Sequence, residues 1–332
     1  MKRLLMLSAI AIVAICSSSY GSSSATELQN SLSSKPQSPI LPNLVHSWFT
    51  SSYNPLYGDI EAVVETEYEL KDIFGELVRG DIVRCTKYYY NEAGDVIEKA
   101  QYKSDGSLYM KWVYKYDFSG NPIESAWYFS DGSLNGKFIY KYDSVGNHIE
   151  EAYYNSDGSL DFKHIYKYDS SGNMIEDADY NSDGSLDMKW VCKYDSSGNM
   201  IEAASYDLDG SLDDKRIYKY DSSGNLIEEA HYDSDGSLYN KYTYKYDSAG
   251  NMIESAWGCS DGSVYGKAIY KYDSSGNMIE CISDNSLIGY GGGYTSTYKK
   301  YDSVGNVIEE TTYSGEALIP QSQTVYEITY RN

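Results

Sequence analysis

Glycine recurs at a fixed interval of 26 residues along most of this chain. Each glycine lies in a Tyr-Asp-x-x-Gly-Asn type turn, and the series consists of Gly94, Gly120, Gly146, Gly172, Gly198, Gly224, Gly250 and Gly276. A fixed period of this size indicates one small supersecondary unit that is repeated and stacked. The sequence therefore constrains the fold more sharply than the activity.

Each repeat contains a second glycine turn, Ser-Asp-Gly-Ser, as at Ser182–Ser185. The segments between the turns are rich in Tyr, Ile and Val, and no apolar stripe of helical period persists across the repeats. Both turns are typical of three-residue hairpin loops, in which a type I turn is followed by a glycine in the left-handed region. The sequence predicts an all-β fold, an antiparallel β-hairpin meander of 26-residue repeats.

The loop length also predicts a register. It places Ala178 opposite Met188 and Glu176 opposite Trp190, so that tyrosine pairs, alanines and glutamates share one face. The other face carries a repeating Lys-(Val/Ile/Thr)-Lys pattern and is expected to be solvated. Each hairpin is predicted to slide by two residues against the last one, and this shear favours a curled or spiral, β-solenoid-like sheet with the tyrosines inside.

Glutamate occupies one position of every repeat, predicted to lie on the tyrosine face. These residues are Glu98, Glu124, Glu150, Glu176, Glu202, Glu228, Glu254 and Glu280. A carboxylate there needs donors, and tyrosine hydroxyls of adjacent strands would supply them as a structural Glu–Tyr ladder. The alternative is a row of polar groups that binds a repetitive polymer.

The first residues have the pattern of an export signal. Lys2 and Arg3 precede an apolar run, 4–15, that is too short to span a bilayer. Two processing routes stay open, an ordinary signal peptide over residues 1–21 or a lipoprotein signal that ends before Cys16. We expect an exported protein that is secreted, periplasmic or on the cell surface, with a lipid anchor to the outer membrane if Cys16 is modified. No other membrane contact is expected.

Composition divides the rest of the chain. Residues 22–55 are rich in Ser and Pro and predict a linker, and residues 56–332 predict the β-repeat domain, with an N-terminal cap over 56–89 and a C-terminal cap over 307–332. The Gly291–Gly293 stretch breaks the period and is interpreted as a loop insertion, because no Gly-Lys-Ser/Thr follows it.

Charge and motif searches exclude several classes of function. The formal net charge of −22 disfavours nucleic acid, which requires a basic surface. The sequence Asp233-Ser-Asp-Gly236 is similar to part of a calcium loop but lacks the distal glutamate, so hairpin chemistry explains it better and we predict no metal. Histidines fall at different repeat positions, and no nucleophile–base constellation is visible. We therefore predict no enzyme and no cofactor.

The units YDSSGNLIEEA, YDSAGNMIESA and YDSVGNVIEE resemble the YD repeats of the Rhs and teneurin class over about residues 88–310. That resemblance implies a spiralling β-sheet shell, and some members of the class bind carbohydrate or cell surfaces. This chain is shorter and more strictly periodic than the large members and looks closer to small exported bacterial proteins. The resemblance therefore implies the shape and not toxin delivery.

The predicted function is a non-enzymatic exported scaffold that binds a glycan or a surface protein. Its contacts are assigned to the tyrosine-rich face and the repeat loops, namely Tyr140, Tyr166, Trp190, Tyr218, Tyr244, Tyr290 and Tyr294. One alternative is a component of a toxin system. Another is a structural protein that assembles through a free edge strand at Thr324–Tyr330. The oligomeric state is left open.

Overall fold

A computed structural model describes residues 56–331, apart from residues 75, 261, 285–293 and 316–317. Its described residues form a single antiparallel sheet of twenty strands. The strands are Ile60–Ile73 (β1), Glu76–Tyr90 (β2), Val96–Tyr102 (β3), Leu108–Tyr116 (β4), Pro122–Phe129 (β5), Leu134–Tyr142 (β6), His148–Asn155 (β7), Leu160–Tyr168 (β8), Met174–Asn181 (β9), Leu186–Tyr194 (β10), Met200–Tyr206 (β11), Leu212–Tyr220 (β12), Leu226–Asp233 (β13), Leu238–Tyr246 (β14), Met252–Gly258 (β15), Val264–Tyr272 (β16), Met278–Asp284 (β17), Tyr294–Tyr301 (β18), Val307–Ser314 (β19) and Ile319–Tyr330 (β20).

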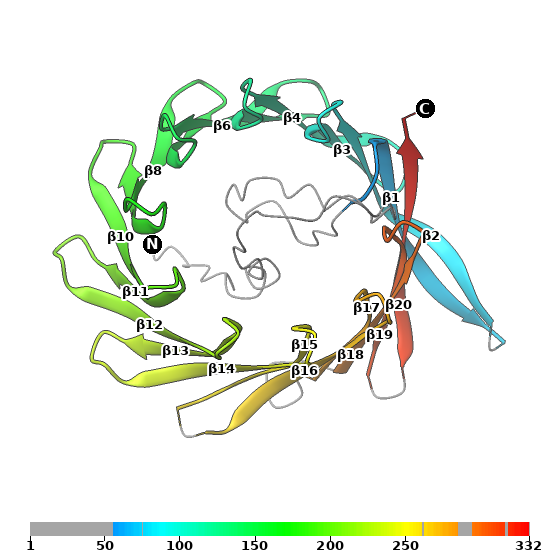
Figure 1. Ribbon diagram of the computed structural model, residues 1–332. Coiled ribbons are helices and arrows are strands. Elements are labelled where there is room, and N and C mark those ends of the chain that lie inside the picture. Colours follow the sequence, from blue (N-terminus) through cyan, green and yellow to red (C-terminus); the bar gives the residue numbers. More distant parts are fainter. Residues whose placement is uncertain (1–55, 75, 261, 285–293, 316–317, 332) are drawn as a thin grey trace, which may run out of the picture.

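The sheet closes into a barrel, so the prediction of a curled or spiral, β-solenoid-like sheet is wrong. Consecutive strands pair all the way round, and β1 pairs with both β2 and β20. At the seam Val63 lies opposite Ile328 and Glu65 opposite Tyr326. Figure 1 shows the resulting ring with β1 beside β20. Closure satisfies the backbone groups that a spiral would leave at two open edges.

A polar clamp reinforces the seam at one rim. The side chain of Asn306 accepts from the backbone N–H of Tyr57 at 2.6 Å and donates to its carbonyl at 2.9 Å. It also donates to the Tyr330 hydroxyl at 2.7 Å, and Asn306 is fully buried. Arg331 forms an ion pair with Asp59 at 2.7 Å.

The strand at Thr324–Tyr330 is not a free edge. It belongs to β20, which pairs with β19 on one side and β1 on the other. The alternative of self-assembly through a free edge at this strand is therefore wrong. The segments predicted as caps contain β1, β2, β19 and β20, which complete the barrel wall.

The hairpin turns have the predicted three-residue loops. In one of them the Asn181 N–H donates to the Ser185 carbonyl and the Gly184 N–H donates to the Asn181 carbonyl, both at 2.9 Å. Gly184 has a φ of 83°, in the left-handed region that favours glycine. Asp183 accepts from both the backbone N–H and the hydroxyl of Ser185. The aspartate of this turn thus stabilises the hairpin loop.

The predicted register is correct beside each turn and wrong beyond it. Tyr180 lies opposite Leu186 as expected, but the next pair is Asp179 with Met188. A β-bulge at Asp187 inserts one residue, and a similar shift at Ile201 follows the other turn. Ala178 therefore lies opposite Lys189 instead of Met188.

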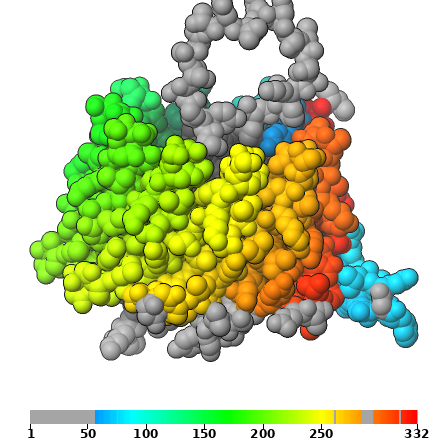
Figure 2. All heavy atoms as spheres, turned by 60° about the horizontal axis from the view of Figure 1, so that its bottom comes forward, coloured from blue at the N-terminus to red at the C-terminus, as the bar shows by residue number. Residues whose placement is uncertain are grey.

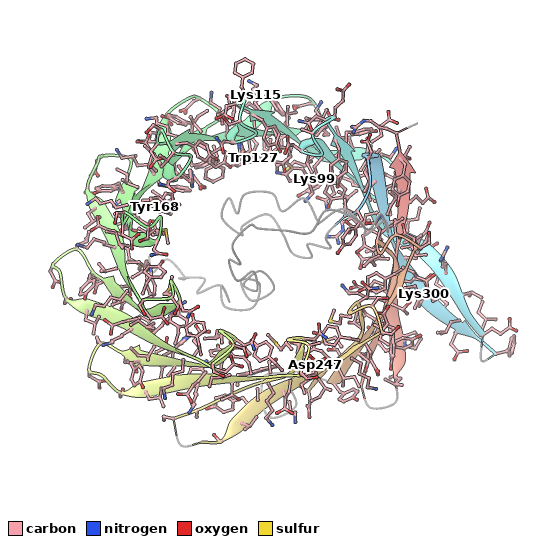
Figure 3. All side chains as sticks on the ribbon, viewed as in Figure 1. Lys99, Lys115, Trp127, Tyr168, Asp247 and Lys300 are labelled. Carbon is pink, nitrogen blue, oxygen red and sulfur yellow. The ribbon has the colours of Figure 1, made fainter. Side chains whose placement is uncertain are left out.

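Since a one-residue slip turns side chains to the other face, the bulges rearrange the two surfaces. In Figure 3 Trp127 points toward the barrel axis and Lys115 points outward. Lys115 pairs with Glu124, so the glutamates lie on the lysine face, and the prediction that they lie on the tyrosine face is wrong. The predicted Glu–Tyr ladder is wrong for the same reason.

Glutamates and lysines instead form an ion-pair ladder around the outer wall. Glu202 lies 2.7 Å from Lys193 on one neighbouring strand and 3.0 Å from Lys215 on the other. The Lys193 side chain is 63% exposed, which confirms that the lysine face is solvated. The same contact recurs in the pairs Lys115–Glu124, Lys141–Glu150, Lys167–Glu176, Lys219–Glu228, Lys245–Glu254 and Lys271–Glu280.

The long β1–β2 hairpin departs from the repeat and extends beyond the wall. Figure 2 shows its tip as a lobe that stands out from the strands beside it. Within the described part of the chain, no helix has the length and apolar character needed to cross a bilayer.

Candidate functional site

The inner wall of the barrel is the candidate binding surface. Twenty strands make a barrel too wide for its own side chains to fill, as in porins. We call residues that lie 26 apart in sequence a column and name each column by its member in the repeat Tyr168–Lys193. Trp127 and Lys99 point inward, and they belong to the Asp179 and Asp177 columns. Because residues directly opposite share a face, the Met188 and Trp190 columns point inward too.

These four inner columns vary strongly from one repeat to the next. The Asp177 column holds Lys99, Ser125, Glu151, Asp177, Ala203, Glu229, Ser255 and Cys281. The Asp179 column holds Gln101, Trp127, Tyr153, Asp179, Ser205, His231, Trp257 and Ser283. The Met188 column holds Met110, Gly136, Phe162, Met188, Asp214, Asn240 and Gly266, and the Trp190 column holds Trp112, Phe138, His164, Trp190, Arg216, Tyr242 and Ala268.

Three outer columns, by contrast, do not vary. The Glu176 column is glutamate throughout, and the Lys189 and Lys193 columns are lysine throughout. Charge pairing around the ring explains why these positions repeat. It does not explain why the intervening inner positions differ in charge, size and polarity from one repeat to the next. The charged outer columns thus stay the same around the ring, and the four variable columns make the inner surface different in each sector.

One sector of the inner wall, on β5 to β8, is aromatic. Trp127 stacks on Tyr153 with ring centroids 5.3 Å apart and planes 5° apart. Phe138 lies 5.6 Å from Trp127 and 6.0 Å from Phe162. These four rings, which we call the aromatic sector, are half-buried and so keep part of their surface accessible. They offer flat apolar faces to whatever enters the barrel.

The adjoining sector, on β7 to β9, is acidic and contains a histidine. Glu151, His164 and Asp179 lie opposite one another in a single row across three strands. Nδ1 of His164 contacts Asp179 and lies 3.9 Å from Asp177. Burial raises the pKa of Glu151 to about 7. Burial opposes protonation of His164, but its hydrogen bond to Asp179 and the nearby carboxylates raise its pKa.

A second polar group lies further round the inner wall, on β12 and β13. Nε2 of His231 lies 2.6 Å from Glu229, and both residues are buried. Arg216 forms an ion pair with Asp214 at 3.0 Å and covers the ring of Trp190 at 4.7 Å. Arg216 thus brings a permanent positive charge to this group, which the acidic sector lacks.

Five of the residues predicted to bind ligand share the inner wall but differ in exposure. Tyr140, Tyr166 and Tyr244 are buried, with 3% to 7% of their surface exposed. Tyr218 and Trp190 are half-buried, and Tyr294 is half-buried at the start of β18. Tyr290 and Cys16 lie outside the described residues. The structure thus brings five of the predicted residues to one surface, where the three buried tyrosines contribute mainly to the wall.

Sequence reasoning missed the four variable columns and the acidic sector. His164 was grouped with the other histidines as isolated, because Glu151, Asp177 and Asp179 lie on other strands. The signal was present in the aligned repeats, where the charged substitutions fall in the Asp177 and Asp179 columns. Only a register that includes the bulges shows that these columns share a face with the Trp190 column.

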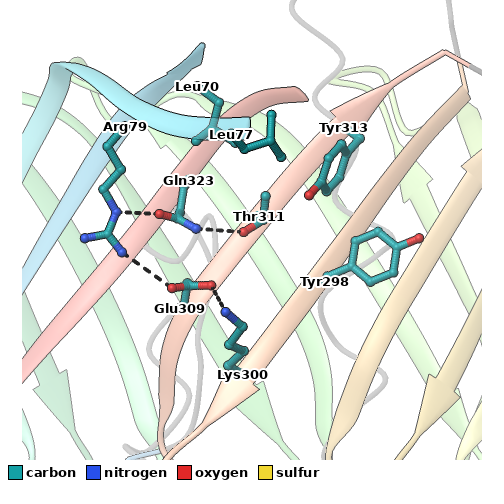
Figure 4. A pocket seen from close by; sticks show the side chains of 9 residues that line it. All are labelled: Leu70, Leu77, Arg79, Tyr298, Lys300, Glu309, Thr311, Tyr313 and Gln323. Atoms are coloured by element: carbon teal, nitrogen blue, oxygen red, sulfur yellow. Dashed lines mark hydrogen bonds and ion pairs between the residues drawn. The ribbon is translucent and has the colours of Figure 1, made fainter. Parts of the chain in front are cut away.

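A separate pocket of about 390 Å³ lies on the outer wall, where β2 leans over β19 and β20 (Figure 4). Arg79 donates to Gln323 at 2.5 Å and lies 3.5 Å from Glu309. Glu309 also pairs with Lys300 at 2.5 Å. These charges already compensate one another, so the contacts serve to hold the β1–β2 hairpin against the wall.

No known family model matches the chain, and no curated protein matches it. Among solved structures it is similar to TcdB2-TccC3 without the hypervariable C-terminal region, at 13% identity and a TM-score of 0.38 over 81% of this chain and 16% of that one. It is also similar to porin-like proteins from Bacteroides uniformis (11% identity, TM-score 0.35, 81% of this chain and 96% of that one) and Bacteroides vulgatus (11%, 0.27, 82% and 99%).

The chain thus spans less than a fifth of the TcdB2-TccC3 chain that it matches. At these TM-scores the likenesses carry no argument about function. Membership of the YD-repeat class stays a prediction from the motif.

Proposed function

We propose that this protein is a non-enzymatic exported scaffold that binds carbohydrate on the inner wall of its barrel. The observation that carries the proposal is the contrast between three constant columns on the outer wall, Glu176, Lys189 and Lys193, and the four variable columns on the inner wall. A purely structural wall requires no such variation, whereas repeat proteins commonly bind ligands on the concave surface that their repeats create. The inner wall is the concave surface here.

The aromatic sector favours carbohydrate over other ligands. The stacked Trp127 and Tyr153 and the neighbouring Phe138 and Phe162 present half-buried ring faces, which suit the flat apolar faces of sugar rings. The acidic sector and the polar group of Arg216 and His231 would form hydrogen bonds with hydroxyl groups. A chain of sugars could contact several sectors at once, because equivalent columns follow one another around the ring.

The outer wall favours contact with water. Transmembrane barrels present an apolar band to lipid, and charged side chains there are destabilising. In this barrel lysine and glutamate recur on the outward face of successive strands, as in the pair Lys193 and Glu202. We therefore propose that the barrel stands in an aqueous compartment outside the cytoplasm, with lipid anchorage through Cys16 as the one membrane contact.

A glycan array with the purified protein tests the proposal. Two inner-wall changes use residues that sister repeats carry in the same columns, Trp127→Ser as in Ser205 and Phe138→Ala as in Ala268. We expect the double variant to fold and to bind at least about tenfold more weakly, because it removes two ring faces and an aromatic contact contributes about 0.5–1.5 kcal/mol beyond its buried area. Tyr206→Ala on the outer wall is the control. Absence of glycan binding, or loss only in the control, would contradict the proposal.

A further inference from the structure

Three carboxylates and one imidazole gather on the inner wall across β7, β8 and β9. His164 lies between Glu151 on one side and Asp179 on the other. Asp177 lies two residues before Asp179 on β9, on the same face of the strand. The ligand atoms of His164, Asp177 and Asp179 all lie within 4.8 Å of one another. Two ligands of one divalent cation, each about 2.0–2.6 Å from the ion, can be at most about 5 Å apart. The three atoms are therefore close enough for one ion.

Glu151 supplies an independent indication. Its side chain is 5% exposed, and its Oε2 has no hydrogen-bond partner among the described residues. A buried carboxylate oxygen without a partner is costly. Glu151 lies directly opposite His164, on the same face as the two aspartates. A cation held by His164 and the aspartates would compensate that oxygen.

We propose that His164, Asp177 and Asp179 bind one divalent transition-metal ion, with zinc or manganese as the best match, and that the Glu151 carboxylate opposite the imidazole supports the bound charge. One imidazole nitrogen with several carboxylate oxygens is a mixed donor set, which suits these ions better than calcium or magnesium. The site is accessible from the barrel interior, because the side chains of His164, Asp177 and Asp179 are 18%, 14% and 33% exposed. Phe162 and Tyr166 flank the imidazole ring and fix its plane.

The sister repeats provide variants that should preserve the fold. Asp177→Ala and Asp179→Ser together reproduce Ala203 and Ser205 of the following repeat. Glu151→Gln keeps the shape of the side chain and removes its charge. Glu229→Gln makes the same change in the same column three repeats later, in the group that contains His231 and Arg216. It is the matched control.

Calorimetric titration of the untagged, metal-free full chain with Zn²⁺, and separately with Mn²⁺, tests the site. We expect one equivalent to bind, at least about tenfold weaker binding in Glu151→Gln, none in Asp177→Ala/Asp179→Ser, and unchanged binding in Glu229→Gln. Circular dichroism checks that each variant is folded. Absence of binding by either ion, or equal binding by the folded double aspartate variant, would overturn the proposal. Anomalous diffraction from zinc-loaded crystals should place the ion beside His164, and an ion located elsewhere would also overturn it.

Discussion

At the scale of single residues, an Asp–Asn pair defines each Tyr-Asp turn. Nδ2 of Asn173 donates to Asp169 at 2.9 Å, and the Asn173 backbone N–H donates to the same carboxylate. In the first turn of the series the two residue types are exchanged, and Asn91 donates to Asp95 at 3.0 Å. The turn therefore requires one amide and one carboxylate, in either order.

That requirement predicts the behaviour of an exchange. Asn173→Asp places two carboxylates against each other, and we expect it to lower the free energy of unfolding by about 1 kcal/mol. The double variant Asp169→Asn/Asn173→Asp reproduces the arrangement at Asn91 and should recover most of that loss. Urea denaturation of the two variants measures the difference. Equal destabilisation of both would show that the pair has a fixed orientation.

The same turns predict acid sensitivity. Hydrogen bonds from the side chain and backbone of Asn173 lower the pKa of Asp169. Equivalent bonds from Asn199 and Asn225 lower the pKa values of Asp195 and Asp221. Because the folded-state pKa lies below the unfolded value of about 3.9, the contribution is present above pH 4 and is lost as the pH falls through the folded value. The midpoint temperature of thermal unfolding should therefore decrease as the pH is lowered below about 4. Exchanging these aspartates for asparagine should flatten that fall, and an unchanged slope would contradict this account.

At the scale of elements, a tyrosine hydroxyl closes the open end of each Ser-Asp-Gly-Ser hairpin. Pairing of β9 with β10 ends at Glu176 and Val191. The Tyr194 hydroxyl then donates to the Met174 carbonyl at 2.8 Å. The contact recurs in most repeats, as Tyr116–Val96, Tyr142–Pro122, Tyr168–His148, Tyr220–Met200, Tyr246–Leu226, Tyr272–Met252 and Tyr301–Met278.

Removal of one such hydroxyl should weaken the hairpin without disrupting packing. We expect Tyr194→Phe to lower the free energy of unfolding by about 1 kcal/mol, the typical net value of one hydrogen bond. Tyr206→Phe is the matched control, because the Tyr206 hydroxyl has no hydrogen bond in the described part of the chain. Urea denaturation compares the two. Equal stability of the two variants would mean that water replaces the contact at no cost.

The hairpin elements were predictable from sequence, but the faces of their strands were not. Turn glycines such as Gly184 and strand composition specify where the chain reverses. Asp187 and Ile201 look like ordinary strand residues, although each marks a bulge. An unrecognised bulge moves Glu176 and Ala178 to the other face. The acidic sector was hidden for the same reason, since it depends on the register of three strands.

At the scale of the whole molecule, closure depends on residues outside the regular repeat. The curvature of each repeat is too small a quantity to derive from sequence, so open and closed sheets could not be distinguished. Asn306 illustrates how a residue in a regular turn position can contribute to closure. Asparagines in the other turns bond to their own aspartate, whereas the side-chain amide of Asn306 donates across the seam to Tyr57 and also donates to Tyr330 of β20.

Loss of that clamp should cost more than loss of its equivalents. We expect Asn306→Ala to lower the free energy of unfolding by about 2–4 kcal/mol, because several buried hydrogen bonds lose a partner. Asn277→Ala removes the corresponding side chain from the preceding turn, where Asn277 bonds to Asp273, and should cost about 1 kcal/mol. Equal losses in chemical denaturation would indicate that the rim contact is dispensable.

A disulfide across the seam tests most directly whether the sheet closes, on which the distinction between inner and outer wall depends. Glu69 of β1 lies opposite Ser322 of β20. In a chain whose native cysteines are replaced, Glu69→Cys/Ser322→Cys should form an intramolecular disulfide on mild oxidation, seen as a gel mobility shift that a reductant reverses. Glu69→Cys/Ser185→Cys, which pairs β1 with a distant turn, should not. A folded Glu69→Cys/Ser322→Cys chain that stays reduced would contradict the closed barrel.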